Sequence, residues 1–350
     1  SENLNPDFKA SLRYEMAAVL DKTQNYQAAF QSLTEAKSIH LGTDSYKIAQ
    51  RGRSGTLTLL SDLCKDLESS AFEKFAHQIA ANPSSQANSQ PKQAFLLGHP
   101  RSGTTLIEQA LDAHPDLVSA DETAIFHNTV WMPTALNKGK RPDRTLAQDL
   151  TSLPQNYLRG LRKDYHAHWL SLMGRDTKHC QVWLDKNPAL TTRLAIIARF
   201  FPDASIIFAL RDPRDVVISS FMQPVGVNDW SINWLTLEET VHYYCFAMQM
   251  WLDIREKLKN PWIEVRYEDC VTDLEKQARR ATTHLGLQWN DAQADIQKHT
   301  KTKLVYSPTY SDVSKPIYSS SVGRWQNYRE HLEPYLKQLA PFVQAFGYND

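Results

Sequence analysis

The chain has few cysteines, and their spacing gives them no shared chemistry. The sequence holds four, Cys64, Cys180, Cys245 and Cys270. None belongs to a C-x-x-C pair, and no cysteine–histidine spacing is typical of zinc. The sequence therefore argues against a zinc site and predicts reduced, structural thiols.

Excess charge and long apolar runs are also absent. Thirty-nine basic residues balance thirty-nine acidic ones among 350 residues, so the chain lacks the overall basic field of a general nucleic-acid binder. No run of eighteen apolar residues is present, which argues against a membrane-spanning helix. No secretory signal pattern is visible either, although the chain begins at Ser1. Any anion binding must then be local.

One further absence falls inside a motif. Residues 98–105, Gly-His-Pro-Arg-Ser-Gly-Thr-Thr, have the spacing of a Walker A loop, but Thr104 stands where that loop has lysine. An apolar run at 94–97 precedes the loop and a helix-compatible run at 106–113 follows it. A strand, a glycine turn and a helix N-terminus present backbone N–H groups to an anion. Without the lysine, the tail of ATP is a poor fit.

The loop side chains add donors to this backbone cradle. Arg101 offers a guanidinium, and Ser102, Thr104 and Thr105 offer hydroxyl groups to phosphate or sulfate oxygens. The alternative is a plain glycine turn, which the order of strand, loop and helix disfavours.

The elements predict an α/β protein with a helical prefix. Two helices are expected near the N-terminus, at 12–21 and 27–40, and their alanines match the small-residue positions of one tetratricopeptide-like repeat. A lone repeat cannot bury its own face. We favour a prefix that stabilises the main domain; a partner or dimer surface is the alternative. We divide the chain into the prefix 1–85, a polar linker 86–92 and a catalytic domain 93–350.

The domain after the linker alternates short apolar strands with helices. This alternation predicts a P-loop-type parallel β-sheet flanked by helices. The strands are expected at 95–98, 182–184, 205–210 and 263–265, and the helices at 104–113, 189–200, 214–222, 235–258 and 272–285. The stretch 128–180 shows no clear strand and is interpreted as an insertion over the site.

A second candidate anion site begins at Arg211. This residue follows the apolar strand 206–210, and ligands of open α/β sheets bind at the carboxyl ends of the strands. Ser219 lies about two turns into the next helix, so the two side chains are positioned to bind a second phosphate. The alternative is a salt bridge from Arg211 to Asp212 or Asp215.

Together the two motifs resemble the sulfotransferase family that uses 3′-phosphoadenosine 5′-phosphosulfate (PAPS). The likeness covers residues 93–350 and is greatest to the bacterial enzymes with tetratricopeptide repeats and to the tyrosylprotein sulfotransferases. It implies that Arg211 and Ser219 bind the 3′-phosphate. It also implies that the 5′-phosphosulfate is bound by Arg101, Ser102, Gly103, Thr104 and Thr105. Such a donor has no β/γ-phosphate pair for a lysine and a metal ion to contact, which accounts for the missing lysine. We therefore expect no metal.

The resemblance also implies the catalytic groups. Glu122, in the segment Ala-Asp-Glu-Thr at 120–123, matches the catalytic glutamate of the tyrosylprotein sulfotransferases and is our candidate general base. The alternative is that Asp121 caps a helix and Glu122 is exposed. His99 and His114 are rival bases, because the small-molecule branch uses histidine.

Lys186 follows the strand 182–184 and matches the family's catalytic lysine. There it would stabilise charge on the bridging oxygen as the bond to sulfur breaks. The alternative is a surface pair with Asp185.

Four further positions complete the comparison with the family. Tyr267 matches a residue near the adenosine, and Lys315 and Arg324 match donor contacts near the C-terminus. Gln223 stands where the tyrosylprotein branch has another arginine, so that donor contact is lacking.

The sequence therefore predicts a cytoplasmic bacterial sulfotransferase. It would transfer a sulfuryl group in line from PAPS to a hydroxyl of a small molecule, a glycan or a peptide tyrosine, and release adenosine 3′,5′-bisphosphate (PAP). We expect no nucleic-acid partner, and a homodimer stays open. The alternatives are a P-loop nucleotide kinase or NTPase, and a non-catalytic repeat scaffold.

Overall fold

A computed structural model of the chain describes residues 5–80, 91–174, 177, 179–294 and 321–349. Its contacts divide the chain into two compact units. The sheet unit comprises residues 59–210 and 250–318, and the terminal unit comprises residues 1–58, 211–249 and 319–350. This division into units differs from the domains predicted from the sequence. The predicted boundary at residue 85 stays a prediction.

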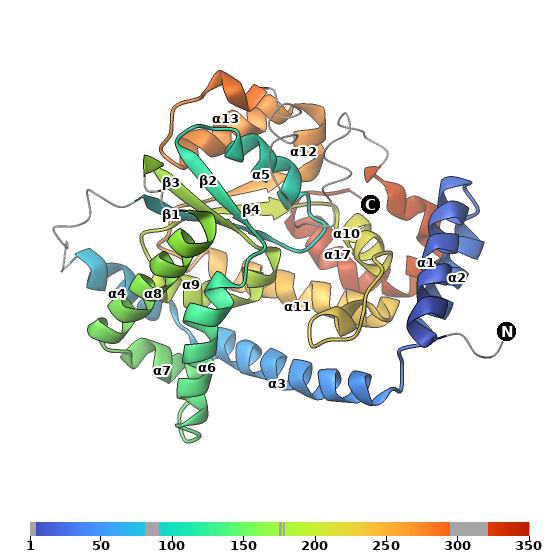
Figure 1. Ribbon diagram of the computed structural model, residues 1–350, viewed down its shortest axis with the longest axis horizontal. Coiled ribbons are helices and arrows are strands. Elements are labelled where there is room, and N and C mark those ends of the chain that lie inside the picture. The colour runs from blue at the N-terminus through green and yellow to red at the C-terminus, as the bar shows by residue number, and fades with distance from the viewer. Residues whose placement is uncertain (1–4, 81–90, 175–176, 178, 295–320, 350) are drawn as a thin grey trace. The chain divides into compact units, whose positions relative to one another are not determined.

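A five-stranded parallel β-sheet forms the centre of the sheet unit (Figure 1). Its order is β2-β3-β1-β4-β5. The strands are β1 (Lys92–Gly98), β2 (Leu117–Asp121), β3 (Val182–Lys186), β4 (Ser205–Leu210) and β5 (Trp262–Arg266). Strands β1, β3 and β4 are almost wholly buried, as expected for parallel strands covered on both faces. The predicted parallel α/β sheet is confirmed, and β2 is a strand that the sequence reading omitted.

Helices cover both faces of this sheet (Figure 1). The face beneath α5 and α13 is aliphatic, with Ile107, Leu111, Ala278 and Ala281 packed on the strands. The opposite face is aromatic, and Phe95 of β1 packs there against neighbouring rings. The α-helices of this unit are α4 (Ser69–Ala80), α5 (Thr104–Asp112), α6 (Met132–Gly139), α7 (Leu146–Ser152), α8 (Gln155–Met173), α9 (Leu194–Phe200), α12 (Tyr267–Thr272) and α13 (Leu274–His284). Shorter turns are the π-helix η1 (His127–Trp131) and the 3₁₀ helices η3 (Pro188–Arg193) and η5 (Asp291–Ala294).

Helices from both ends of the chain build the terminal unit. Its α-helices are α1 (Pro6–Lys22), α2 (Tyr26–Ser38), α10 (Pro213–Phe221), α16 (Arg329–Leu332) and α17 (Leu336–Ala345), with the 3₁₀ turns η4 (Ser231–Trp234), η7 (Arg324–Tyr328) and η8 (Glu333–Tyr335). Two long helices, α3 (Asp44–Asp66) and α11 (Leu237–Arg255), contribute residues to both units. Asn5 and Asn25 cap α1 and α2 through their side chains, which explains where these helices begin.

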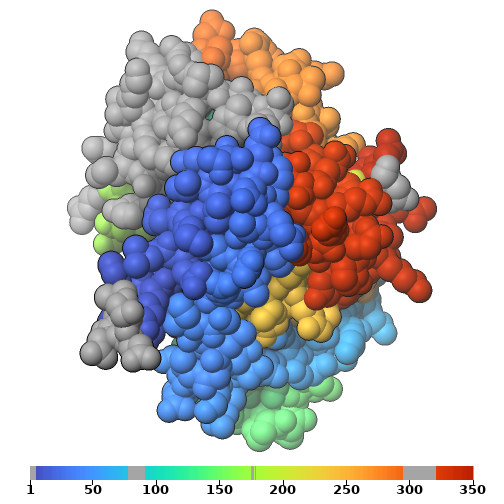
Figure 2. Space-filling view, turned by 90° about the vertical axis from the view of Figure 1, so that its right-hand side faces the viewer, coloured from blue at the N-terminus to red at the C-terminus, as the bar shows by residue number. Residues whose placement is uncertain are grey.

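The N-terminal helix pair packs on the C-terminal segment of the same unit. Figure 2 shows the blue N-terminal helices beside the red C-terminal residues. The ring of Phe30 on α2 stacks on His331, with centroids 3.7 Å apart. The Tyr328 hydroxyl and Arg324 both donate to Asp21 on α1. The predicted helical prefix is therefore present, and it contacts other parts of this chain; its identity as a tetratricopeptide repeat stays a prediction.

A buried lysine joins the prefix to the segment after α10. The Lys37 ammonium donates to the carbonyl oxygens of Gln223 and Trp234, at 3.0 and 2.7 Å. It also lies 5.0 Å from the ring centroid of Phe221. Burial lowers the pKa of Lys37 to about 7, because water no longer solvates the charged form.

In the part of the chain that the structure describes, no helix combines the length and the apolar character that crossing a bilayer requires.

Candidate active site

The loop between β1 and α5 has a backbone that requires glycine at two places. Gly98 has a φ of +142°, and a Cβ atom there would lie 2.5 Å from the carbonyl oxygen of Ala209 on β4. Gly103 has a φ of +87° and precedes α5 without a side-chain cap, and its Cβ would lie 2.5 Å from the ring of Tyr267. Only glycine fits either place without strain. The strand, loop and helix of the predicted anion cradle are therefore present in the predicted order.

The loop side chains are buried or half-buried, and their role in anion binding stays a prediction. Ser102, Thr104 and Thr105 are buried, and Arg101 is half-buried with a left-handed φ of +74°. Thr191 of η3 supports the start of the loop, because its hydroxyl donates to the Gly98 carbonyl at 2.6 Å and accepts from the Gly98 N–H at 2.9 Å. No sequence signal marked Thr191, which reaches the loop from 93 residues away.

A cluster of opposite charges lies at the carboxyl ends of β2 and β3. Asp121 and Lys186 are register partners on these strands. The Lys186 ammonium pairs with the Asp121 carboxylate, and it donates to the Glu122 carboxylate at 2.9 Å. The Glu122 N–H also donates to the Lys186 carbonyl at 2.8 Å. The structure therefore brings Glu122 and Lys186 together, and their catalytic roles stay predictions.

The backbone at Glu122 explains how two successive carboxylates reach one ammonium. In an extended strand, successive side chains point to opposite faces. Glu122 instead has a φ of +51°, in the left-handed region that is uncommon outside glycine and asparagine. This turn directs Glu122 toward the same cation as Asp121. Such local strain is characteristic of functional sites.

A further buried carboxylate lies close to this cluster. Glu108 of α5 accepts from the Ser119 hydroxyl on β2 and from the Gln109 amide, the latter at 2.8 Å. Burial acts to lower the pKa of Lys186, but Glu122, Glu108 and Asp121 outweigh it and the pKa is raised. Lys186 is thus a positive charge at neutral pH despite being fully buried.

Asp185 points to the other face of the sheet, away from Lys186. Its carboxylate accepts from the Tyr165 hydroxyl at 2.8 Å, and the Tyr165 oxygen accepts from Gln93 at 3.2 Å. Burial raises the pKa of Asp185 to about 7, partly offset by the Tyr165 hydrogen bond and by the charge of Lys186. The alternative of a surface pair between Asp185 and Lys186 is therefore wrong, since neither residue is at the surface.

Both histidines considered as alternative bases form contacts within the fold. His99 is fully buried, its Nδ1 lies 2.8 Å from the Pro100 carbonyl, and burial lowers its pKa to about 4. His114 precedes β2, at the opposite end of that strand from Glu122. Its Nδ1 accepts from the Asp116 N–H and its Nε2 donates to the Gln288 carbonyl. Both ring nitrogens of His114 are therefore engaged in hydrogen bonds within the fold.

Tyr267 lies beside the loop, and its predicted contact with the adenosine stays a prediction. Tyr267 is the first residue of α12, and its ring closely approaches Gly103. An aromatic ring here is suited to contact a base or sugar bound by the loop.

The terminal unit contains the second predicted anion site. Arg211 is buried; one nitrogen donates to the Ser321 carbonyl at 2.5 Å and lies 3.9 Å from Asp215. Ser219 lies on α10 and is half-buried, and its carbonyl accepts from the Gln223 amide at 3.2 Å. Asp212 instead pairs with the neighbouring Arg214.

Asp215 organises the turn that leads to the C-terminal segment. Its two oxygens accept from the backbone N–H groups of Gly323 and Trp325, each at 2.8 Å. Arg324, between them, pairs with Asp21 at 2.5 Å in this structure, so its predicted phosphate contact stays a prediction. Lys315 lies outside the described residues.

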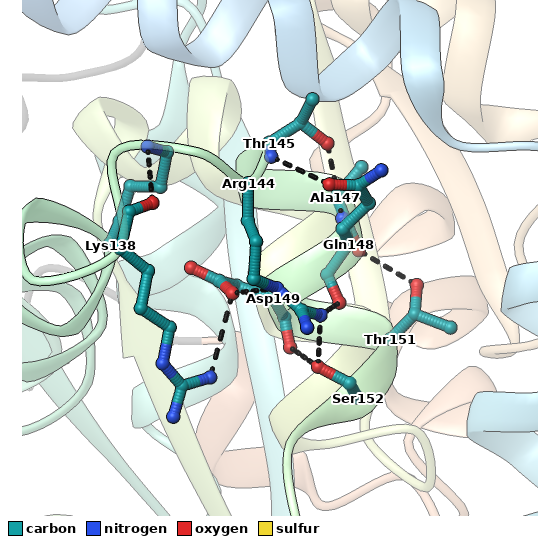
Figure 3. A network of polar contacts seen from close by, with 9 residues as sticks. Lys138, Arg144, Thr145, Ala147, Gln148, Asp149, Thr151 and Ser152 are labelled. Carbon is teal, nitrogen blue, oxygen red and sulfur yellow. Dashed lines mark hydrogen bonds and ion pairs between the residues drawn. The ribbon is translucent and has the colours of Figure 1, made fainter.

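A separate cavity of about 780 Å³ opens between the end of α3, α4 and α7. Figure 3 shows the network at its wall, where Arg144 forms an ion pair with Asp149 at 2.8 Å and donates to the Ser152 hydroxyl at 2.7 Å. Thr145 and Gln148 form a capping box that begins α7. None of the predicted site residues lines this cavity. Among the residues that the structure describes, no cluster of histidine, cysteine or carboxylate side chains could hold a metal ion.

Comparison with known proteins places the chain in a family. The sequence profile of the sulfotransferase family matches residues 93–291, which is more than half of the chain. The protein belongs to the sulfotransferase family.

Its relatives share a low level of identity. An uncharacterised protein of Aquifex aeolicus is 23% identical over 337 residues, which cover 95% of this chain and 41% of the relative. Protein-tyrosine sulfotransferase 1 of Danio rerio is 25% identical over 269 residues, which cover 73% of this chain and 72% of the relative. The chain thus spans less than half of the Aquifex protein. The sulfotransferase domain of the Synechococcus PCC 7002 olefin synthase is 20% identical, with a TM-score of 0.46 over 69% of this chain and 90% of that one.

Proposed function

We propose that the protein transfers a sulfuryl group from PAPS to an acceptor hydroxyl. The observation that carries this proposal is the meeting of Glu122 and Lys186 at the carboxyl end of the sheet. The strand order β2-β3-β1 aligns Glu122, Lys186 and the Gly98–Thr105 loop on three adjacent strands. Ligands of such sheets bind at this edge.

The loop fits the 5′-phosphosulfate end of the donor. Gly103 leaves the first N–H groups of α5 without a side-chain cap, and these groups attract an anion. Arg101, Ser102, Thr104 and Thr105 supply the charge and the hydroxyl donors. By the family motif, Arg211 and Ser219 bind the 3′-phosphate. Tyr267, Lys315 and Arg324 are the remaining proposed donor contacts.

Glu122 and Lys186 each have one role in the proposed reaction. The Glu122 carboxylate accepts the proton of the acceptor hydroxyl while that oxygen forms its bond to sulfur. Lys186 stabilises the electron pair that remains on the bridging oxygen as the old sulfur–oxygen bond breaks. The products are a sulfate ester and PAP. The transfer needs orientation and cationic donors, which these residues provide without a metal ion.

The relatives support a choice of which acceptor to test first. Several are protein-tyrosine sulfotransferases, so a peptide tyrosine is the first acceptor to test, and glycans and small hydroxylated molecules come next. The alternative of a P-loop kinase or NTPase shares the loop spacing, but Thr104 stands in place of its phosphate-binding lysine, which argues against it.

Replacement of Glu122 tests the proposal. Glu122→Gln keeps the hydrogen bond from Lys186 and removes the base, so turnover of PAPS with a panel of hydroxyl acceptors should fall at least about a hundredfold. Binding of PAP, measured by calorimetry, should be unchanged. A matched control is Glu256→Gln, since Glu256 is an exposed residue just after α11 that forms a surface ion pair with Arg255. A fully active Glu122→Gln variant would remove Glu122 from the role of base.

A further inference from the structure

Lys186 has two direct carboxylate partners that differ sharply in exposure. The Asp121 side chain is 4% exposed and the Glu122 side chain is 38% exposed. A pair enclosed in the protein interior is held far more rigidly than one that faces water, because water competes for exposed partners. The two contacts are therefore unequal, although both reach the same ammonium.

The Asp121 contact is built into the sheet. Asp121 is the last residue of β2 and pairs in register with Lys186, the last residue of β3. Neighbours in register on adjacent strands have their Cβ atoms close together on the same face. The hydrogen bond from the Ser119 N–H to Asp112, at 2.6 Å, further fixes β2 against α5. The strand pairing thus holds the backbone of Asp121 opposite Lys186.

The Glu122 contact depends on one turn of the backbone. Glu122 lies just beyond β2 in a left-handed conformation, and its side chain reaches the surface of the site. A general base must approach the acceptor hydroxyl to within hydrogen-bonding distance. A carboxylate that was the sole counter-ion of a buried lysine could not leave it without exposing an unpaired buried charge, which is costly.

We propose that Asp121 is the positioning residue that makes Glu122 available as a base. Asp121 stays paired with Lys186 throughout the reaction and holds the ammonium in place. Glu122 shares that ammonium in the resting enzyme and exchanges it for the acceptor hydroxyl. This inference rests on the proposed function, because it explains how Glu122 can act as the base while Lys186 keeps a carboxylate partner.

The pH dependence of turnover tests the inference. In Asp121→Asn, Glu122 is the only direct carboxylate partner left to Lys186 among the described residues. The Glu122 carboxylate then stays paired with the lysine, and the negative charge beside it at position 121 is lost. We expect kcat to fall about a hundredfold, the acid limb of the pH–kcat profile to move to lower pH, and the KM for PAPS to stay unchanged. A general structural defect would lower kcat without moving that limb.

Two further variants make the result decisive. Asp121→Glu retains the charge and should restore the wild-type acid limb, even where kcat stays reduced. Asp116→Asn changes an aspartate just before the opposite end of β2, whose side chain accepts from Gln181, and should behave as wild type.

An unshifted acid limb in Asp121→Asn, or equal profiles for the Asn and Glu variants, would overturn the inference. If Asp121→Asn does not fold, Asp121→Glu decides alone: a folded variant with a displaced limb contradicts the proposal, and a preserved limb supports it. A fully active Glu122→Gln variant would instead refute the proposed function, so the two failures are distinguishable.

Discussion

Asp185 should make the protein less stable as the pH rises. Asp185 belongs to β3, and its carboxyl group is fully buried. One of its oxygens accepts a hydrogen bond from the Tyr165 hydroxyl, and the other accepts none from the described residues. Burial raises its pKa from 3.8 to about 7. The folded protein therefore holds this proton more tightly than the unfolded chain does. The stabilisation is complete below about pH 4, and it is lost as the pH rises to about 7.

The size of the effect follows from the shift. A difference of about three pKa units corresponds to about 4 kcal/mol between low and neutral pH. Asp185→Asn imitates the neutral acid and keeps an oxygen for the Tyr165 hydroxyl, but its amide N–H group needs a new acceptor, at a cost of about 1 kcal/mol. We therefore expect the variant to be about 3 kcal/mol more stable than wild type at pH 8, and no more stable at pH 4.

Urea unfolding of both proteins between pH 4 and pH 8 measures this difference. A matched control is Asp203→Asn in the same unit, because Asp203 is about half exposed and pairs with Arg162 at the surface. Its effect should be below about 1 kcal/mol at every pH. An Asp185→Asn variant that is less stable than wild type at pH 8, or a stability difference that does not change with pH, would refute the reasoning.

Two further predictions concern the loop and the helical prefix. Gly103→Ala places a side chain in the left-handed backbone region and against Tyr267, so it should cost about 1–2 kcal/mol of stability. It should also weaken PAP binding, measured by calorimetry. Gly139→Ala, where the added Cβ meets open space, is the control. Because burial lowers the pKa of Lys37 from 10.5 to about 7, the folded state loses this proton first, and wild-type stability should rise between those pH values. Lys37→Met should abolish that rise in denaturant titrations, and an unchanged slope would contradict the account.

The local parts of the site could be predicted from the sequence because each lies within one strand–loop–helix segment. The loop at Gly98–Thr105 needs only the glycine spacing and its flanking pattern, and the position of Lys186 needs only the apolar strand before it. Arg211 likewise follows directly from β4. These features depend on periodicity and turn chemistry, which a single sequence displays.

The remaining parts depend on pairings between distant segments. Strand β2 is short and contains the polar residues Ser119 and Asp121, so its pattern is weak, and its place beside β3 is a matter of strand order. The ion pair of Asp121 with Lys186 and the support of Gly98 by Thr191 follow from that order. The pairing of Arg324 with Asp21 joins segments 303 residues apart. No local pattern contains such information.

Calorimetry with PAP and with ATP–Mg²⁺ tests the central claim most directly. A loop that lacks the lysine, in a chain that also carries the Arg211 and Ser219 motif, predicts binding of PAP and none of ATP–Mg²⁺. Adenosine 5′-phosphosulfate, which lacks the 3′-phosphate, should bind more weakly than PAP. Tight binding of ATP–Mg²⁺ and no binding of PAP would contradict the account.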